Sequence, residues 1–377
     1  MSPIEEVIDQ KKIAVCCGAG GVGKTTVAAS LALEAARRGR RVLVLTIDPS
    51  RRLAETLGVS QNTPDPVELS PALQELAGIK PPGSLAAWIL NPERVSDRTV
   101  KRLVPDPKKA RKLMDQPIYR SLVSMTVGMQ EYTAMEALHQ FVEQGRFDFI
   151  VLDTPPSRNA LNFLEAPVRL GRFFDSRVFS LFLPRKDGAV IGTTRKVIDK
   201  VFGGIFGVEF YHDLQDFFRN FAEVFLQLSE NAKAIRQRLE CEDCCFLLVA
   251  SPTAERVEDA VYLKHRIDAL NLNLGGFILN RSLIPLADRS LPGPDLLPST
   301  PTDAQRSALA KLQELATIER TRLEEHRQIL EQLAEEAGDS SMALAVPELG
   351  DTVDDIQGLG LVAQSLIEAS ESVAQRR

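Results

Sequence analysis

A glycine-rich loop directly after a short apolar run constrains this chain more than any other feature. The apolar run is 13–17 and is typical of a strand buried on both faces. The loop is 18–23, and the Ala- and Leu-rich segment 24–38 after it predicts a helix that ends before Gly39. A second apolar run, 41–46, predicts the next strand. The order strand, loop, helix, strand favours a parallel sheet.

The loop fits two phosphate-binding templates. Its glycine spacing matches G-x-G-x-x-G, a dinucleotide fingerprint in which Asp48, after the second strand, could hold a ribose. With Lys24 and Thr25 added, it matches the P-loop pattern G-x-x-x-x-G-K-[ST]. We favour the P-loop, because this pattern demands lysine and threonine at fixed positions.

The P-loop chemistry explains why these residue types are needed. Glycines let successive backbone N–H groups converge on phosphate oxygens, and the helix that begins at Lys24 directs its positive end there. Lys24 is expected to reach the β- and γ-phosphates of ATP, and Thr25 to ligate Mg²⁺. A third apolar run ends in Asp153, which supplies the second carboxylate that such a site needs.

Composition and charge exclude several other classes. The chain has 377 residues with 44% hydrophobic and 25% charged residues, and its net charge is −6. This is typical of a soluble globular protein and argues against nucleic-acid binding. No secretory signal is recognised at 1–10, and the apolar runs are far shorter than the ~20 residues of a membrane span. Five cysteines, an odd number, suggest free thiols in a reducing compartment, so we expect a cytoplasmic protein.

The predicted organisation is an α/β fold: a mostly parallel sheet flanked by helices, with an inserted helical subdomain. Further strands are expected at 147–153, 245–250, 276–280 and 342–346. We expect one domain, 1–377, whose nucleotide-binding core comprises approximately 11–58, 145–165, 241–284 and 338–377. The rest is expected to form helical insertions at 59–144, which shows no strand pattern, and at 166–240, and a helical segment at 303–336.

Several of these segments together resemble one family. Cys17–Thr26 resembles the deviant Walker A motif of the arsenite-pump and tail-anchored-protein-targeting ATPases. The segment 48–50 is similar to that family's switch I, and 153–157 to its switch II. Asn280 resembles its adenine-contacting asparagine, and 128–131 is a weaker match to an element before switch II.

The resemblance implies a P-loop ATPase fold, a dimer, and a role for each matched residue. Lys24 and Asp48 would be catalytic, with Asp48 orienting the attacking water. Mg²⁺ would be held by Thr25 and, through water, by Asp153. The residues implied in ATP binding are Gly18, Gly20, Gly21, Val22, Gly23, Lys24, Thr25, Thr26 and Asn280.

Two departures from the family pattern affect the expected dimer. The family carries a signature lysine directly after the first glycine of the loop, and it contacts the partner's nucleotide; here that residue is Ala19. We therefore expect either a homodimer, with Arg51 or Arg52 as a substitute, or a heterodimer with a lysine-bearing paralogue. The family's targeting members also place a zinc-binding Cys-x-x-Cys beyond the position of Asn280, where this chain has no cysteine.

The cysteines and the phenylalanine-rich stretch are further candidates for function, and each also has a purely structural interpretation. The segment Cys241–Cys245 contains a Cys-x-x-Cys that could share a zinc between two chains, but we favour ordinary thiols. Twelve of the 17 phenylalanines fall within 163–225. The residues spaced as one helical stripe are Phe217, Phe218, Phe221, Val224, Phe225 and Leu228. This stripe is either core, which we favour, or a groove for an apolar helix. The four histidines share no ligand spacing.

These observations lead to one functional hypothesis with alternatives. We expect a Mg²⁺-dependent ATPase that couples ATP binding and hydrolysis to rearrangement of a helical subdomain, for targeting or chaperoning apolar client segments. The alternative is the energising subunit of an anion or metalloid exporter, for which a membrane partner would be needed. Arsenite requires soft thiolates, and the cysteine spacing offers no clear set. A positioning ATPase is a third class, but such proteins lack long insertions.

Overall fold

The computed structural model describes most of the chain. It covers residues 1–47, 52–60, 63–117, 119–120, 129–155, 217, 224, 227–228, 230–231, 233–287, 292–350 and 355–375. These residues belong to two compact units. The first unit comprises Met1–Ile89, Gly145–Leu161 and Leu239–Arg377, and the second comprises Leu90–Gln144 and Asn162–Arg238.

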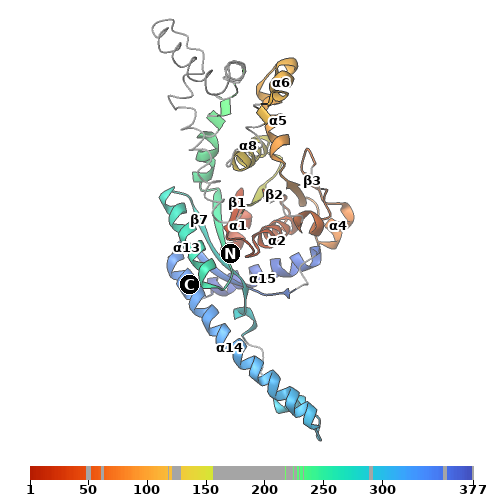
Figure 1. The fold of residues 1–377 in the computed structure, drawn as a ribbon, viewed down its shortest axis with the longest axis vertical. Coiled ribbons are helices and arrows are strands. Elements are labelled where there is room, and N and C mark those ends of the chain that lie inside the picture. Colours follow the sequence, from red (N-terminus) through yellow and green to blue (C-terminus); the bar gives the residue numbers. More distant parts are fainter. Residues whose placement is uncertain are drawn as a thin grey trace, which may run out of the picture. The chain divides into compact units, whose positions relative to one another are not determined.

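The first unit is built on one eight-stranded sheet with the order β3-β4-β2-β5-β1-β6-β7-β8 (Figure 1). The strands are β1 Ile13–Gly18, β2 Arg41–Thr46, β3 Val67–Glu68, β4 Ser84–Ile89, β5 Phe149–Asp153, β6 Cys244–Ala250, β7 Leu274–Ser282 and β8 Met342–Pro347. Every neighbouring pair is parallel except β3 with β4. The predicted α/β fold, a mostly parallel sheet flanked by helices, is confirmed.

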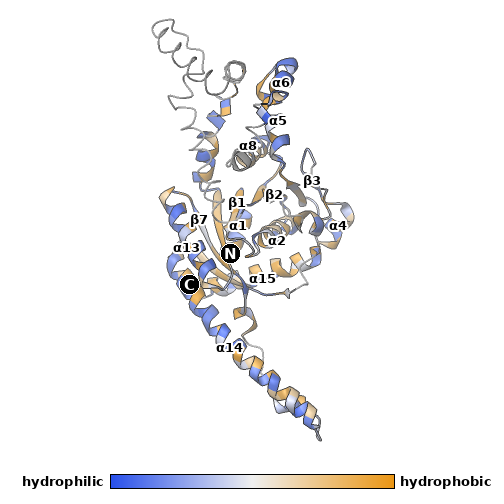
Figure 2. Ribbon diagram, viewed as in Figure 1, coloured by the Kyte–Doolittle hydropathy of each residue, from blue (hydrophilic) through white to orange (hydrophobic). Residues whose placement is uncertain are grey.

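Helices bury both faces of this sheet. On one face lie α1 Pro3–Gln10, α2 Lys24–Arg37 and α15 Ile356–Ala374, packed on alternate strand residues such as Cys16 and Val44. The residues between them point to the other face, which α13 Ala254–Ala269 and α14 Asp303–Ala337 cover. All six residues of β1 are buried, as expected for a strand with neighbours on both sides and helices on both faces. Figure 2 shows β1 in the orange of hydrophobic residues.

The helix α14 is one element of 35 residues, where the sequence predicted a helical segment at 303–336. Thr302 caps it in a capping box with Gln305. Its C-terminal part buries Leu333 and Ala337 and packs on β7 and β8. The N-terminal part is mostly exposed and carries the uncovered side chains Leu312, Leu315 and Ile318.

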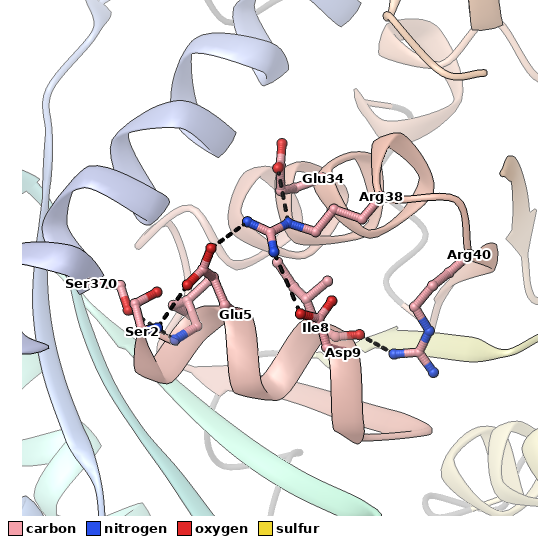
Figure 3. A network of polar contacts seen from close by, with 9 residues as sticks. Ser2, Glu5, Ile8, Asp9, Glu34, Arg38, Arg40 and Ser370 are labelled. Atoms are coloured by element: carbon pink, nitrogen blue, oxygen red, sulfur yellow. Dashed lines mark hydrogen bonds and ion pairs between the residues drawn. The ribbon is translucent and has the colours of Figure 1, made fainter.

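The helix α1, Pro3–Gln10, is one that the sequence did not predict. Ser2 and Glu5 close a capping box at the start of α1. Glu5 and Asp9 both pair with Arg38 at the end of α2, and the N–H of Ile4 donates to Ser370 Oγ on α15 (Figure 3). The helix α1 therefore makes polar contacts with both α2 and α15, and its own apolar side is buried.

One expectation about strand content is wrong. The stretch 59–144 was expected to contain no strand, but β4 and β3 lie within it and extend the sheet beyond β2. The strand β4 contains two alanines and one β-branched residue, so its six residues carry little of the β-branched pattern that marks a strand. The short helices α3 Arg52–Thr56 and α4 Pro71–Leu76 complete this edge of the first unit.

The second unit is helical where it is described. It contains α5 Pro92–Leu103, α6 Pro107–Met114 and α8 Met129–Gln144. Buried Glu136 on α8 pairs with Arg102 on α5 and accepts 2.9 Å from Asn231 Nδ2, so it joins residues of both chain segments of this unit. Among the described residues of the chain, no helix is long and apolar enough to cross a membrane.

Candidate functional site

The glycine-rich loop lies at the carboxyl end of the central strand β1, between that strand and α2. A Cβ on Gly18 would lie 2.2 Å from the carbonyl oxygen of Val249 on β6. Gly23 has a φ of +89°, and a Cβ there would lie 2.2 Å from Asn280 Nδ2. Only glycine fits either position. The strand–loop–helix geometry of a P-loop therefore has a close contact at each end of the loop, with the backbone of β6 at Gly18 and with the Asn280 side chain at Gly23.

Lys24 is held against the loop that precedes it. Its side chain is buried, and Nζ donates a 2.8 Å hydrogen bond to the carbonyl oxygen of Ala19. The first turn of α2, which begins at Lys24, presents backbone N–H groups at the same place. A fixed ammonium beside the first N–H groups of a helix is suited to binding the phosphates of a nucleotide.

A buried carboxylate lies at the end of the neighbouring strand β5. Asp153 Oδ2 accepts from Thr25 Oγ1 at 2.7 Å and from Thr46 Oγ1 at 2.9 Å. Asp153 is fully buried, so three elements, β5, β2 and α2, converge on one carboxylate oxygen. Hydroxyl and carboxylate oxygens are the hard ligands that Mg²⁺ prefers, and the two atoms expected to hold it are in contact here. The donor set therefore fits Mg²⁺.

Thr46 and Thr154 are site residues to which the sequence motifs gave no individual role, although Thr154 lies within switch II. Thr154 Oγ1 donates 2.8 Å to the carbonyl oxygen of Cys16, at the end of β1. Thr46 is the register partner of Asp153 between β2 and β5. Thr46 ends the apolar run 41–46, and this could have indicated its place in the site. The carboxyl ends of parallel strands meet at one edge of a sheet, so a polar residue that ends such a strand lies at that edge.

Asn280, at the end of β7, reaches the loop from the other side. Its Nδ2 donates 2.8 Å to the carbonyl oxygen of Val22. The asparagine is buried, and the following residue, Arg281, has a φ of +60° where the pairing of β7 with β8 shifts its register. Asn280 thus braces the P-loop, and its predicted contact with adenine stays a prediction.

Some of the other predicted site residues lie in the described part of the chain, and some lie outside it. Gly20 and Gly21 are exposed, Val22 is buried, and Thr26 is half-buried in the first turn of α2. Asp48, the rest of switch I, Arg51, Gly128 and the end of switch II after Pro155 lie outside the described residues, and nothing of the Arg52 side chain is described. Of the apolar stripe, Phe217, Val224 and Leu228 are described, and all three are buried, as expected of core residues.

Ala19 and four of the five cysteines are small buried residues. Ala19 is only 2% exposed. Burial raises the pKa of Cys17 to about 12 and that of Cys16 well above its usual value, so both thiols stay protonated. Cys244 and Cys245 are buried in β6, and only Cys241 is exposed. Within the described part of the chain, no three His, Cys, Asp or Glu side chains are grouped to hold a metal.

Comparison with known proteins identifies the family. The sequence profile of the anion-transporting ATPases matches residues 11–290, about three quarters of the chain. The chain belongs to the anion-transporting ATPase family. It is an ATPase, as the P-loop and Lys24 predicted, and the resemblance noted from the sequence is confirmed.

Individual relatives of this anion-transporting ATPase agree with the assignment. The ATPase GET3C of Arabidopsis thaliana is 26% identical over 293 residues, which cover 73% of this chain and 68% of the relative. The ATPase ARSA1 of Chlamydomonas reinhardtii is 28% identical over 300 residues, which cover 73% of this chain and 36% of the relative. The arsenical pump-driving ATPase of Escherichia coli is 27% identical over 169 residues, which cover 42% of this chain and only 26% of the relative.

Proposed function

We propose that this ATPase is Mg²⁺-dependent and uses its nucleotide state to rearrange a helical unit that holds apolar client segments. The contact between Thr25 and Asp153 carries the first part of the proposal, because it brings together the two oxygens suited to the metal. When bound, Mg²⁺ would neutralise charge on the β- and γ-phosphates. Lys24 would hold those phosphates, and the helix N–H groups of α2 would orient them.

Asp48 is proposed to orient the attacking water. The proposal rests on the position of Asp48 in the sequence, two residues after Thr46, which ends β2 and donates a hydrogen bond to Asp153. A carboxylate that fixes the water raises turnover without holding the phosphates, so its loss should affect kcat more than ATP affinity.

The coupling follows from the chain path. The strand β5 ends at Asp153, and the second unit resumes at Asn162, a few residues further on. A change in contact between the γ-phosphate and switch II would therefore reach the helices of the second unit along a short stretch of chain. Glu136 joins both segments of that unit, so the helices would respond together.

An apolar client is proposed as the cargo of the second unit. Its support is the concentration of phenylalanine in 163–225 and the resemblance to targeting ATPases. The alternative cargo is an arsenical or another anion, which the name of the Escherichia coli relative suggests. Against it, the buried cysteines of β1 and β6 are protonated, and Cys241 is the one exposed thiol in the described chain.

The working assembly is proposed to be a cytoplasmic dimer without nucleic acid. Because Ala19 carries no charge, either a homodimer would hydrolyse ATP slowly, or a paralogue with lysine at this position would complete one of two sites. The heterodimer is the preferred arrangement, since both catalytic aspartates are kept in this chain.

One experiment separates the cargo classes. The purified chain is assayed for ATP hydrolysis with an apolar helical peptide, with a polar peptide of equal length, and with arsenite. We expect stimulation by the apolar peptide alone, and stable capture of that peptide by the Asp48→Asn variant in ATP. Stimulation by arsenite without any effect of the apolar peptide would replace the targeting function with the exporter function.

A further inference from the structure

The charge of the chain is distributed unevenly, and the excess of cations lies on α5 and α6. The segment 90–120 has nine basic and four acidic residues, a net charge of +5 in a chain whose total is −6. The remaining residues therefore carry −11. Figure 2 shows α5 and α6 with much of their ribbon in the blue of hydrophilic residues.

Eight of these nine cations are exposed; Arg120 lies beyond α6 and Arg102 has a partner, which leaves six on the two helices. We call them the basic face: Arg94, Lys101, Lys108, Lys109, Arg111 and Lys112. Each of the two helices buries the opposite side, with Val95 and Val100 on α5 and Ala110 and Leu113 on α6. Among described residues, no ion pair involves the basic face. Its charges are therefore directed to solvent and held on two packed helices.

Two of the four acidic residues of the segment have partners other than the basic face. Asp97 accepts 2.8 Å from Tyr119 Oη, and Asp106 caps α6 by accepting from the backbone N–H groups of residues 108 and 109. Arg102 is the exposed basic residue that does have a partner, because it pairs with buried Glu136. Asp97, Asp106 and Arg102 thus stabilise the second unit. The six cations of the basic face remain exposed to solvent and can bind an external anion.

We propose that the basic face docks this ATPase on an anionic membrane surface, through lipid phosphate and carboxylate headgroups. The inference rests on the proposed function, because apolar segments carried by the second unit have a bilayer as their destination. A cluster of four to eight cations on amphipathic helices is the pattern that anionic lipids attract, at about 1 kcal/mol per cation.

A bilayer fits this surface better than other polyanions do. Four of the six cations are lysines, which act as point charges and need no fixed geometry. No aromatic side chain is exposed in the described part of 90–120, since Tyr119 is buried, so no platform for stacking bases exists there. The face also lacks the exposed apolar anchor that a peptide partner would require.

The test uses the full chain and two triple variants of equal charge change. Lys108→Gln, Lys109→Gln and Lys112→Gln together neutralise half of the basic face. The control neutralises three exposed cations elsewhere, Lys80→Gln, Lys311→Gln and Arg320→Gln. Binding is measured by co-sedimentation with vesicles of phosphatidylcholine alone and of phosphatidylcholine mixed in equal parts with phosphatidylserine, at low and high salt.

We expect binding to the mixed vesicles only, lost at high salt, and weakened on the order of 100-fold by the basic-face variant but little by the control. Equal binding to neutral vesicles, equal loss in both variants, or binding of duplex DNA or an acidic peptide with vesicles ignored would overturn the proposal. Capture of the apolar peptide is measured in parallel. If capture fails while vesicle binding behaves as expected, the proposed cargo is wrong and the membrane surface stands. If the apolar peptide is captured but the vesicles are not bound, the membrane surface is wrong and the proposed cargo stands.

Discussion

Thr25 Oγ1 lies 2.7 Å from Asp153 Oδ2, although 128 positions separate the two residues in the sequence. The contact links the first turn of α2, which follows the P-loop, to the end of β5, where switch II begins. A hydroxyl and a carboxylate that meet here define the metal-binding corner of the proposed site.

Asp153→Asn is predicted to weaken Mg²⁺ binding without unfolding the chain. The amide keeps the shape of the carboxylate but loses its charge, so the apparent Mg²⁺ affinity in ATP hydrolysis should fall on the order of 10- to 100-fold. Thr46→Val is the matched control, because it removes the other hydrogen bond to the same oxygen. It should cost about 1 kcal/mol of stability and change the Mg²⁺ dependence much less. Equal Mg²⁺ dependence in wild type and Asp153→Asn would remove Asp153 from the metal site.

Lys24→Ala is predicted to abolish hydrolysis and strongly weaken ATP binding, because the buried ammonium beside the loop would be gone. Asp48→Asn should keep ATP affinity nearly intact and slow turnover. Isothermal titration with ATP and steady-state kinetics distinguish the two effects. If both variants lose ATP affinity equally, the role assigned to Asp48 is wrong, and binding of NAD in place of ATP would refute the P-loop assignment.

Ala19→Lys is predicted to speed hydrolysis and to lower stability. A cation that reaches the partner's nucleotide should raise turnover in a dimer, since loss of such a cation can cost ~10³ in rate. Ala19 is buried, however, so a longer side chain should cost about 1–3 kcal/mol of folding free energy.

Ala19→Met separates size from charge. It should be destabilised like Ala19→Lys but should not gain activity, as judged by chemical denaturation and ATP turnover. The assay is repeated with any co-purifying paralogue. Fast hydrolysis by the lone wild-type chain, unchanged by Arg51→Ala or Arg52→Ala, would show that the site needs no crossing cation.

Glu5→Gln is predicted to destabilise the fold at neutral pH but not in acid. The pKa of Glu5 is lowered from 4.5 to about 2 because the Ser2 backbone N–H and the Arg38 guanidinium both bond its carboxylate. Its contribution, about 1 kcal/mol for so exposed a network, is therefore full above pH about 4.5 and lost as the pH falls towards 2.

Thermal unfolding across this pH range checks the prediction for Glu5. The melting temperatures of wild type and Glu5→Gln should differ at neutral pH and converge near pH 2. Glu6→Gln, a neighbouring exposed residue on the same helix, should match wild type throughout. A gap between wild type and Glu5→Gln that widened on acidification would contradict the assigned pairing.

Much of the fold could be predicted because its signals are local. Buried parallel strands are short apolar runs, and β1, β2 and β5 to β8 are of this kind. The strand β4 escaped prediction because its alanines fit helices and strands alike. The two-residue strand β3 is too short for any periodicity.

The site could be predicted in its residues but not in its contacts. Lys24, Thr25 and Asp153 belong to motifs with fixed spacing, so their roles follow from pattern and chemistry. The bond from Asn280 to Val22 depends on the pairing of β7 with β6 in the sheet, which no local pattern specifies. For the same reason the cluster of Glu136 with Arg102 and Asn231 was not foreseen, since it joins segments nearly 100 residues apart.

The central claim is that the nucleotide state of the P-loop changes the helical unit, and hydrogen exchange tests it most directly. Exchange is compared between ADP and a non-hydrolysed ATP state, the latter trapped with Asp48→Asn, for 90–144 and for the Phe-rich stretch 163–230. The Lys24→Ala variant, which should not bind nucleotide, provides the baseline. We predict different protection of these helices in the two states, with the far strand β8 unchanged. Identical protection in ADP and ATP, with both nucleotides shown to be bound, would contradict the account.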